Sequence, residues 1–367
     1  MRGSWRIAAI VAAATVGNGV FALPFVFYKA GWLIGLFYLA ALGTIIAAAH
    51  TVYLGTLEKV GEKERLLGLA GKYLGRGGFW AGFIAIVAGL LLTLVAYLIL
   101  GAQFIGLALP DLPLAPAFVI FWLFISLPIF LENGRVADLE FAGITCTAGI
   151  IFLIFFSAWP NIAFNGAPAV NPREFFLPFG AVLFSLAGWT SIEPAYEMRK
   201  RFGAGEIPWK PLAAGTFFAA ALYIMFSAGI IGSAATIAQD TVSGLSGWPL
   251  WKKEAIALMG LIAVATVYLP ISREIKNALE KDLRWNKYFA RAAIMFLPLI
   301  PIALGVNDFL AIIGLVGGVF VATQYLLIIS VGRRALALSK AKKFSLDAAV
   351  IVFIAAAVYE VWTFIVH

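Results

Sequence analysis

The sequence predicts an all-α membrane protein with eleven transmembrane helices, because of its composition, the length of its apolar blocks and the placement of its charges. Of the 367 residues, 62% are hydrophobic and 13% are charged, whereas soluble globular chains are about 45–50% apolar and about 25% charged. Many apolar blocks reach about 18 residues or more, as a hydrocarbon core about 30 Å thick requires of a spanning helix. Such a chain cannot bury its apolar surface within itself.

The expected spans are apolar runs separated by charged or turn-rich stretches. Basic clusters at 59–76, 199–210, 273–291 and 333–343 separate the second span from the third, the sixth from the seventh, the eighth from the ninth and the tenth from the eleventh. The eleven spans are expected at 5–30, 32–57, 79–109, 117–131, 139–159, 175–198, 212–235, 254–280, 288–304, 307–332 and 345–366.

The charge distribution predicts the orientation. With a cytoplasmic amino terminus, 23 of the 27 basic residues lie on the inside, and only Lys29, Arg173, Lys252 and Lys253 lie outside. This is the positive-inside pattern of a multi-pass protein of the cell membrane, and it makes the carboxyl terminus extracellular. The net charge of +8 then indicates contact with anionic lipid and gives no reason to expect a nucleic-acid partner.

Several chemistries are disfavoured by residue counts. One cysteine, Cys146, and two histidines, His50 and His367, cannot form a structural zinc site or a disulfide framework. No His, Asp or Cys cluster of a membrane-embedded enzyme stands out. We therefore expect neither a metal centre nor a cofactor, and no enzymatic activity.

The first span begins like a secretory signal but continues too far. Arg2, Arg6 and the alanines at 12–14 resemble a signal with its cleavage site, yet the apolar run extends to Lys29. A spanning helix fits better.

The middle of the first span carries an interruption. It reads Val-Gly-Asn-Gly-Val over 16–20 and is followed by Pro24. Glycines weaken a helix, and unpaired backbone at mid-membrane depth is tolerated only where it is buried in protein or lines a cavity. We therefore expect the helix to be unwound at this point.

The sixth span carries a second interruption at 184–194, where Gly188, Ser191 and Pro194 surround the carboxylate of Glu193. Paired Gly/Pro interruptions in corresponding helices point to a transporter site between inverted repeats. We therefore expect a single transporter domain over 1–367. It would comprise a first five-helix repeat at 1–159, a second, inverted repeat at 175–332, and an additional helix at 345–366.

Broken helices expose free N–H groups at one half-helix end and free carbonyls at the other. The amides of Gly19, Val20 and Phe21 would hold a carboxylate, and the carbonyls between Ser185 and Gly188 would hold an ammonium group. Such an arrangement favours an amino acid as substrate. The expected site at the breaks comprises Gly17, Asn18, Gly19, Val20, Phe21, Ser185 and Gly188.

Aromatic and polar residues are candidates for the pocket around the substrate side chain. They are Tyr97, Gln103, Phe184, Trp189 and Tyr268. The alternative for each aromatic is ordinary packing or a position at the membrane interface. An aromatic lining favours a neutral, apolar or aromatic substrate side chain.

Two residues are candidates for binding the coupling ion. Glu193 would carry a proton, since an intramembrane carboxylate usually marks an ion path; alternatively it reaches cytoplasmic water or an arginine such as Arg199. Thr266 would be a sodium ligand on the eighth span, but no adjacent hydroxyl pair accompanies it. This favours a proton over sodium.

The residues at the two breaks carry a resemblance to a known family. The segment 17–24 resembles the GxGxxxLP first-helix signature of the amino acid/auxin permease (AAAP) family of the APC superfamily, and 184–191 resembles its sixth helix. Tyr97 to Gln103 and Pro270-Ile271 are similar more weakly. Where the family often reads Ile-Pro-Glu, this chain reads Ile192-Glu193-Pro194. The resemblance implies a LeuT-type fold with alternating access and symport of amino acids with protons or sodium.

The sequence thus predicts a secondary active transporter, a proton-coupled or sodium-coupled symporter of a neutral amino acid that works as a monomer in the lipid bilayer. An exchanger of amino acids or polyamines with the same fold is the alternative. A membrane receptor or a membrane-embedded enzyme is a more distant one.

Overall fold

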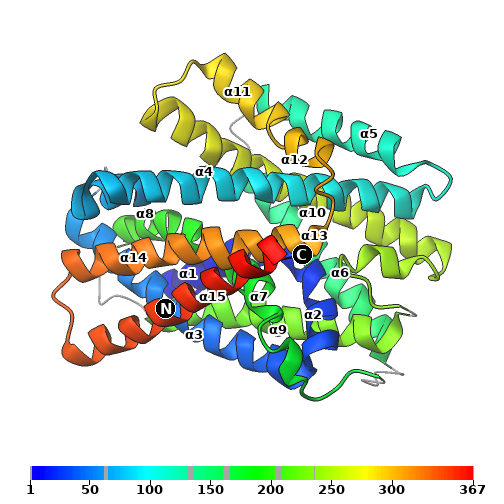
Figure 1. The fold of residues 1–367 in the computed structure, drawn as a ribbon, viewed down its shortest axis with the longest axis horizontal. Coiled ribbons are helices and arrows are strands. Elements are labelled where there is room, and N and C mark those ends of the chain that lie inside the picture. The colour runs from blue at the N-terminus through cyan, green and yellow to red at the C-terminus, as the bar shows by residue number, and fades with distance from the viewer. Residues whose placement is uncertain are drawn as a thin grey trace.

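The computed structural model describes residues 2–61, 65–130, 136–159, 166–202, 209–234 and 236–366, and within these ranges it is helical without strands. Positions 131 and 235, at the ends of two expected spans, lie outside the described residues, as does His367. Figure 1 shows α4 and α14 running roughly parallel along the long axis, with α5, α11 and α12 on the far side of α4 from α14.

The first half of the chain consists of α1 (Arg2–Thr15), the 3-10 helix η1 (Asn18–Ala22), α2 (Leu23–Ala30), α3 (Trp32–Val60), α4 (Leu66–Ala108), α5 (Leu114–Ser126), the 3-10 helix η2 (Leu127–Phe130) and α6 (Val136–Ala158).

The second half begins with η4 (Pro172–Glu174), α7 (Pro178–Leu186), η5 (Trp189–Ser191), α8 (Ile192–Phe202), α9 (Trp209–Ser233), η6 (Val242–Leu245) and α10 (Leu250–Asn277). A π-helical segment η7 (Ala278–Asp282), α11 (Lys287–Phe296), α12 (Leu299–Ala303), α13 (Phe309–Leu315), a second π-helical segment η8 (Val316–Val321), α14 (Ala322–Ala335) and α15 (Lys340–Val366) complete it.

Six of the described helices are long and apolar enough to cross a membrane. They are Trp32–Val60, Leu66–Ala108, Trp209–Ser233, Leu250–Lys281, Phe309–Ala335 and Lys340–Thr363. The pair Trp5–Thr15 and Asn18–Ala30, bent by 50°, makes a seventh span if it is counted as one. The chain is therefore a multi-pass membrane protein. The total of eleven spans and the division into inverted repeats stay predictions.

The remaining expected spans coincide with shorter helices. Leu114–Ile129 and Thr145–Ala158 are apolar but short. The expected span at 175–198 is divided into α7 and α8, and the one at 288–304 into α11 and α12, with Pro298 at the second division. Proline interrupts a helix because it lacks an N–H and its ring clashes with the preceding turn.

Helix α4 begins earlier than the expected third span. It starts at Leu66 and turns at Gly75, whose φ of 78° and ψ of −167° are not helical. A positive φ suits glycine, which has no Cβ to clash. The first turns bury Leu66, Leu67 and Leu69 against the rest of the protein, so this short arm is part of the core.

The core surrounds the interrupted first and sixth spans. Helix α4 packs against α10, α5 and α14, while α1 packs against α9, and α9 packs in turn against α3 and α6. The largest fully buried side chains include Tyr53, Tyr223, Tyr268, Tyr325 and Phe21. Long helices thus enclose both breaks on several sides.

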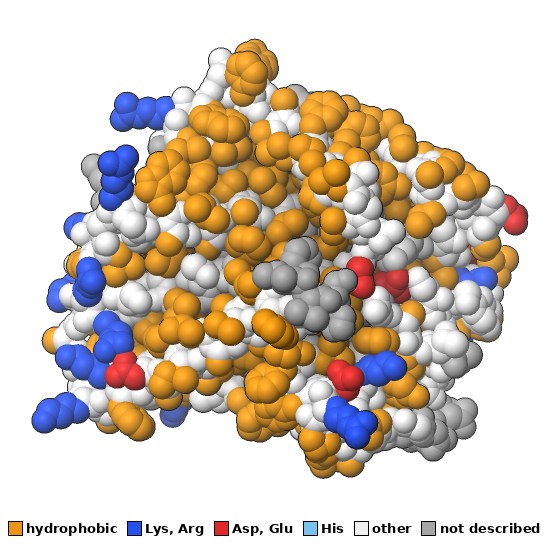
Figure 2. Space-filling model, in the orientation of Figure 1, with side chains coloured by type: hydrophobic (Ala, Val, Ile, Leu, Met, Phe, Trp, Pro, Cys, Tyr) orange, Lys and Arg blue, Asp and Glu red, His pale blue; other side chains and the backbone are white. Residues whose placement is uncertain are grey.

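The surface carries the signature of a membrane protein. Large apolar side chains such as Phe37, Phe124, Phe156 and Phe289 are exposed, and Figure 2 shows a broad apolar surface with most Lys and Arg of that face at its left end. The α14–α15 connection lies at this left end in Figure 1. It is flanked by Arg333 and Arg334 in the last turn of α14 and by three lysines in the first turn of α15, all exposed.

Candidate functional site

The first break lies between α1 and η1. Helix α1 ends at Thr15, Val16 and Gly17 form a bend, and Gly17 has extended backbone angles of φ −129° and ψ −175°. Asn18 opens the 3-10 helix and is fully buried, and its side-chain oxygen and nitrogen have no hydrogen-bond partner among the described residues. The predicted unwound point is therefore present in this structure.

The second break lies between α7 and η5. Helix α7 ends at Leu186, and Ala187 then takes extended angles of φ −66° and ψ 105°. Gly188 precedes the short turn of η5, and α8 continues from Ile192. A Cβ at Gly188 would overlap Thr15 Oγ1, so the second break packs directly against the end of α1.

The two breaks contact each other. A Cβ at Gly19 would lie 2.6 Å from Ser185 Oγ, closer than real Cβ atoms come to a neighbour. The hydroxyl of Tyr223, on α9, joins the breaks from behind: it accepts from Gly17 N at 3.4 Å and lies 2.5 Å from Thr15 O and 2.7 Å from Ser185 O. Since a hydroxyl has one proton to donate, the two carbonyls are alternative acceptors.

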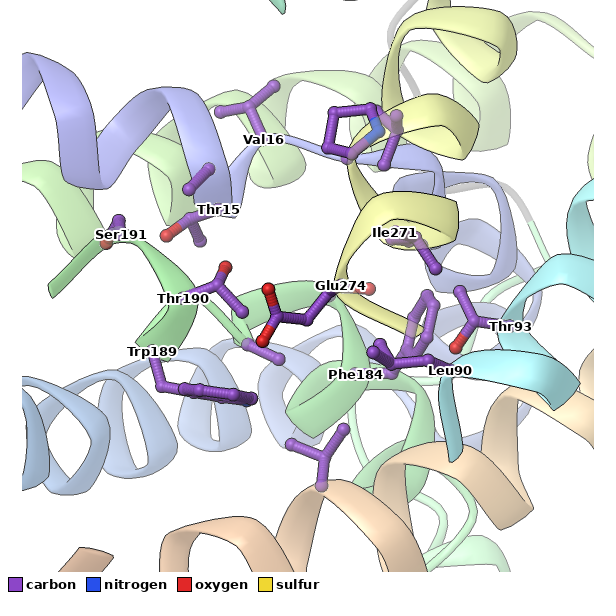
Figure 3. Close-up of a pocket in the computed structure, with 18 of the residues that line it drawn as sticks. Thr15, Val16, Leu90, Thr93, Phe184, Trp189, Thr190, Ser191, Ile271 and Glu274 are labelled. Carbon is purple, nitrogen blue, oxygen red and sulfur yellow. The ribbon is translucent and has the colours of Figure 1, made fainter. Parts of the chain in front are cut away.

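A cavity of about 550 Å³ opens beside these breaks (Figure 3). In the view, Trp189 and Thr190 lie across from Leu90 and Thr93, and Glu274 projects between them. The lining comes from α1, η1, α4, α7, η5, α8, α10, η8 and α14: Ile10, Ala13, Ala14, Thr15, Val16, Gly17, Gly19, Gly89, Leu90, Thr93, Tyr97, Phe184, Ser185, Ala187, Trp189, Thr190, Ser191, Pro194, Thr266, Val267, Pro270, Ile271, Glu274, Val316, Val321 and Gln324.

Most of the predicted residues are close to this cavity, and seven line it: Gly17, Gly19, Tyr97, Phe184, Ser185, Trp189 and Thr266. Phe21 lies behind the wall, where its ring meets those of Phe104 and Phe226 edge-on at 5.3 and 5.4 Å. Asn18, Val20 and Gly188 are buried at the breaks without lining the cavity.

Two of the predicted pocket residues point elsewhere. The cavity face of α10 contains Thr266, Val267, Pro270, Ile271 and Glu274, spaced as one side of a helix. Tyr268 falls on the opposite side and is fully buried there. Gln103 donates a hydrogen bond of 2.5 Å to Asp240, in the connection before η6. Neither side chain lines the cavity, because helical periodicity directs each away from it.

Trp189 is held in place by a residue that the sequence analysis missed. Its Nε1 donates to Gln324 Oε1 at 2.7 Å, and Gln324 Nε2 donates to Ala85 O at 2.9 Å. Gln324 lies on α14 and Ala85 on α4, so the amide joins three elements around the cavity. An uncharged amide in the middle of the expected span at 307–332 was the available signal, because polar side chains within membrane helices usually face the bundle interior.

Charged residues gather at one end of the cavity. Arg65, just before α4, lies 3.3 Å from the carboxylate of Glu274 on α10 and 3.6 Å from that of Glu193 on α8. Tyr53 Oη also donates to Glu193 at 2.9 Å. We call Arg65, Glu193 and Glu274 the Arg65 cluster; all three side chains are between a quarter and a half exposed.

The Arg65 cluster agrees with the alternative that Glu193 reaches an arginine, although that arginine is Arg65 and not Arg199. Glu193 pairs with Arg65, whereas Arg199 pairs with Glu58 at 2.6 Å. Glu193 itself does not line the cavity, but Glu274 does. Glu274 was not identified from the sequence. Its signal was a carboxylate near the end of the expected span at 254–280, since an intramembrane carboxylate usually marks an ion path.

Thr266 lies where α10 meets α6. Its Oγ1 donates to Ala263 O at 2.9 Å, and a Cβ at Gly143 of α6 would overlap it. The hydroxyl oxygen keeps a lone pair for a further partner. Its neighbour in the cavity wall, Val267, adds no oxygen ligand.

The chain was compared with known proteins. No protein-family model and no curated protein matches it. It resembles the solved structure of MhsT in complex with L-phenylalanine, with a TM-score of 0.65 and 12% identity over 96% of this chain and 98% of that one. It also resembles the Eremococcus coleocola manganese transporter in complex with an aromatic bis-isothiourea substituted compound, with a TM-score of 0.57 and 12% identity over 99% and 94%.

These similarities extend over nearly the whole chain at low sequence identity. They therefore show the fold, whereas the function of the site must be inferred from the residues that form it. The chain has the LeuT-type fold.

Proposed function

We propose that this protein is a secondary active transporter that moves a neutral amino acid together with a coupling cation by alternating access. The observation that carries the proposal is the meeting of two helix breaks at one cavity, with Gly17 and Gly19 in its wall. A ligand at this point faces main-chain groups at helix ends rather than side chains.

The main chain at the breaks suits a zwitterion. The half-helix starting at η1 offers amides with partial positive charge, which favour a carboxylate, and the end of α7 offers carbonyls, which favour an ammonium group. A Cβ at Gly17 would have only Thr15 O nearby, at 3.8 Å, so open space adjoins this residue. A substrate can therefore approach the backbone closely there.

The rest of the wall suits an apolar substrate side chain. Ile10, Leu90, Phe184 and Val321 contribute apolar surface, and Trp189 adds an aromatic ring. Glu274 is the only charged side chain among the described lining residues. A divalent metal substrate would require several oxygen, nitrogen or sulfur ligands, so the lining favours an amino acid. Of the similar structures, MhsT was solved with L-phenylalanine bound.

Alternating access would move the interrupted helices against α4 and α10. The Arg65 cluster spans that division, since Glu193 lies on α8 and Glu274 on α10. Parting of these groups would open this end of the cavity, and their pairing would narrow it. A substrate can drive such a shift only by binding one conformation more tightly than the other.

The proton is the favoured coupling ion, with Glu193 as a candidate carrier. Thr266 is the candidate for sodium, and a sodium site needs several oxygen ligands, whereas its cavity neighbour Val267 supplies none. We further propose membership of the AAAP family, a cytoplasmic amino terminus, an extracellular carboxyl terminus, and function as a monomer without a cofactor. The basic end of the molecule in Figure 2 supports this orientation.

The test is uptake of a labelled mixture of the twenty amino acids by purified protein in liposomes. An inward proton gradient in sodium-free buffer should drive accumulation, and a sodium gradient alone should not. Counterflow from preloaded liposomes without gradient-driven accumulation would identify an exchanger instead. Failure of all three formats would contradict the amino acid assignment.

A further inference from the structure

A carboxylate on the last helix lies far along the chain from the Arg65 cluster, in a notch made of glycines. Glu360 of α15 fits against Gly180 on α7, Gly314 on α13 and Gly318 on η8, which we call the glycine notch. A Cβ at Gly314 would lie 3.0 Å from Glu360 Oε2, and a Cβ at Gly180 or Gly318 would overlap the Glu360 side chain. The carboxylate fits only because these three residues have no side chains.

Glu360 also binds the backbone of an interrupted helix. Its carboxylate lies against the backbone of Gly180, where a Cβ would overlap Glu360 Oε1, and it interacts with the backbone N–H of that residue. Gly180 is the third residue of α7, which begins at Pro178, so its N–H has no acceptor within that helix. A negative charge at this position interacts favourably with the helix end. Glu360 therefore fastens the start of α7 to α15.

The elements that pack against Glu360 bring no opposite charge. Helix α15 packs against α14, η8, α13 and α7, and the sequences of α7, α13 and η8 contain no Asp, Glu, Lys, Arg, His or Tyr. On α14, Tyr325 stacks with Phe353, two turns before Glu360. Arg333 pairs with Asp347 and Arg334 with Tyr73 O, both near the start of α15.

The remaining titratable groups nearby are acids. Tyr359 adjoins Glu360 on α15, and Glu174 of η4 and Tyr38 of α3 lie within electrostatic reach of Tyr359. Asp308 is engaged with Ala311 N at 3.0 Å, at the start of α13. Arg173 adjoins Glu174 on η4, but within the described ranges no Lys, Arg or His forms an ion pair with Glu360. An ionised carboxylate in a membrane span is costly without such a partner, and binding a proton removes the cost.

We propose that Glu360 is a proton-binding site whose occupancy controls the attachment of α7 to α15. In the step, the carboxylate takes up one proton and becomes a neutral acid, no other bond is made or broken, and the charge that favours the Gly180 amide is lost. The inference rests on the proposed function for its consequence: the proton bound at Glu360 is the coupling ion, and Glu193 then has only a secondary part in the proton path.

The contact between Glu360 and α7 is close to residues of α7 that line the cavity. Gly180 and Phe184 are four residues apart on α7 and so lie on one side of that helix, and Phe184 and Ser185 line the cavity. Gly317 of η8 continues the same contact, since a Cβ there would overlap Gly180 O and lie 3.0 Å from Phe184 Cβ. Weakening of the contact at Gly180 therefore loosens the half-helix that carries the second break. With the expected orientation, α7 begins at the outer face, where the proton enters.

The direct test is infrared difference spectroscopy of the purified protein between alkaline and acidic pH. We expect a carboxylic acid C=O band that titrates in the wild type, shifts in heavy water, disappears in Glu360→Gln and persists in Asp347→Asn. Asp347 is a matched control because it lies on the same helix and is paired with Arg333. A titrating band that is unchanged in Glu360→Gln would overturn the proposal.

The second test is transport in the same liposomes. Glu360→Gln should lose proton-driven accumulation and the pH dependence of exchange, while retaining counterflow, and Asp347→Asn should match the wild type. Wild-type pH dependence in Glu360→Gln would overturn the proposal. If Glu360→Gln does not fold, Glu360→Asp serves: a shifted infrared band is expected, and an unshifted one contradicts the assignment.

The infrared measurement needs no substrate, which separates two kinds of failure. A titrating band lost in Glu360→Gln, together with no uptake of any amino acid, would refute the proposed function and leave the proton site standing. Proton-driven uptake with the same pH dependence in the wild type and in Glu360→Gln would refute the proton site and leave the proposed function standing.

Discussion

A carboxylate lies at each end of the interrupted sixth span, Glu193 within α8 and Glu360 of α15 against α7, and the two carboxylates differ in whether a cation is paired with them. Glu193, on α8, shares Arg65 with Glu274 and accepts a hydrogen bond from Tyr53. Glu360, against α7, has a backbone amide and glycines. A carboxylate with a cation is stabilised in its charged form, whereas one without a cation in a membrane favours protonation. Residue type alone therefore does not reveal which carboxylate carries the proton.

The largest effect is expected at the glycine notch. Gly318→Ala places a Cβ on top of Glu360 Cγ, and overpacking of this kind costs about 1–3 kcal/mol. We expect a lower melting temperature of the purified protein and loss of uptake. The double variant Gly318→Ala with Glu360→Ala should recover much of the stability, because it removes the atoms that clash.

Gly77→Ala is the matched control, since nothing lies within 4 Å of a Cβ at Gly77. If the losses of stability from the two single substitutions simply add in the double variant, Gly318 and Glu360 do not contact each other. The contrast between Glu193 and Glu360 would then have no support at Glu360.

The next effect is expected where the two breaks are joined. Tyr223→Phe removes the hydroxyl that contacts Gly17, Thr15 and Ser185, and a typical hydrogen bond contributes about 1 kcal/mol. Substrate affinity should fall about five- to tenfold, the factor to which about 1–1.4 kcal/mol corresponds. Equilibrium binding of the transported amino acid measures it. Tyr288→Phe, on an exposed ring, should bind as the wild type does.

Substitutions in the Arg65 cluster should change the stability of the protein less, but they should clearly increase access to the cavity. Arg65→Ala leaves Glu193 and Glu274 without their shared cation, but exposed ion pairs contribute only about 0–1 kcal/mol. We expect a nearly unchanged melting temperature and faster labelling of Thr190→Cys in a Cys146→Ser background, because repulsion opens this end of the cavity. Arg65→Lys should label slowly. Equal labelling rates in all three proteins would show that the cluster does not restrict access.

The smallest effect on coupling is expected at Glu193. Glu193→Gln removes one carboxylate while Arg65 keeps Glu274 as a partner, so pH-driven uptake should be weakened and not lost. The comparison is with Glu360→Gln at matched expression. Loss of coupling in Glu193→Gln with normal coupling in Glu360→Gln would reverse the roles of the two ends. Unimpaired pH-driven uptake in Glu193→Gln would remove Glu193 from the proton path.

The sequence was sufficient for those features that are local in the chain. The breaks within 16–20 and 184–194 could be predicted because Gly, Asn, Ser and Pro interrupt apolar runs, and their free backbone groups need a cavity or protein around them. Long unbroken helices such as α3 and α9 followed from apolar length alone. The basic end of the molecule was predicted by the spacing of its charges.

Features that depend on contacts between distant segments could not be predicted. Gly17 and Tyr223 are 206 residues apart, and Arg65 and Glu274 are 209 apart. Tyr268 was predicted from its side-chain type alone, whereas the cavity face of α10 contains 266, 267, 270, 271 and 274. Glu360 was overlooked because the fit of a carboxylate among three glycines exists only in the folded chain.

The central claim is that the two breaks form an amino acid site, and Gly17 permits the most direct measurement. Its backbone is extended and a Cβ there meets only Thr15 O, at 3.8 Å, so Gly17→Val should fold while its side chain fills substrate space. The measurement is equilibrium binding of labelled neutral amino acids to the purified wild type, to Gly17→Val and to the control Gly106→Val, which also meets open space.

We predict saturable binding to the wild type and to Gly106→Val, and its loss in Gly17→Val at an unchanged melting temperature. Binding to Gly17→Val with wild-type affinity, or no binding to the wild type, would contradict the claim.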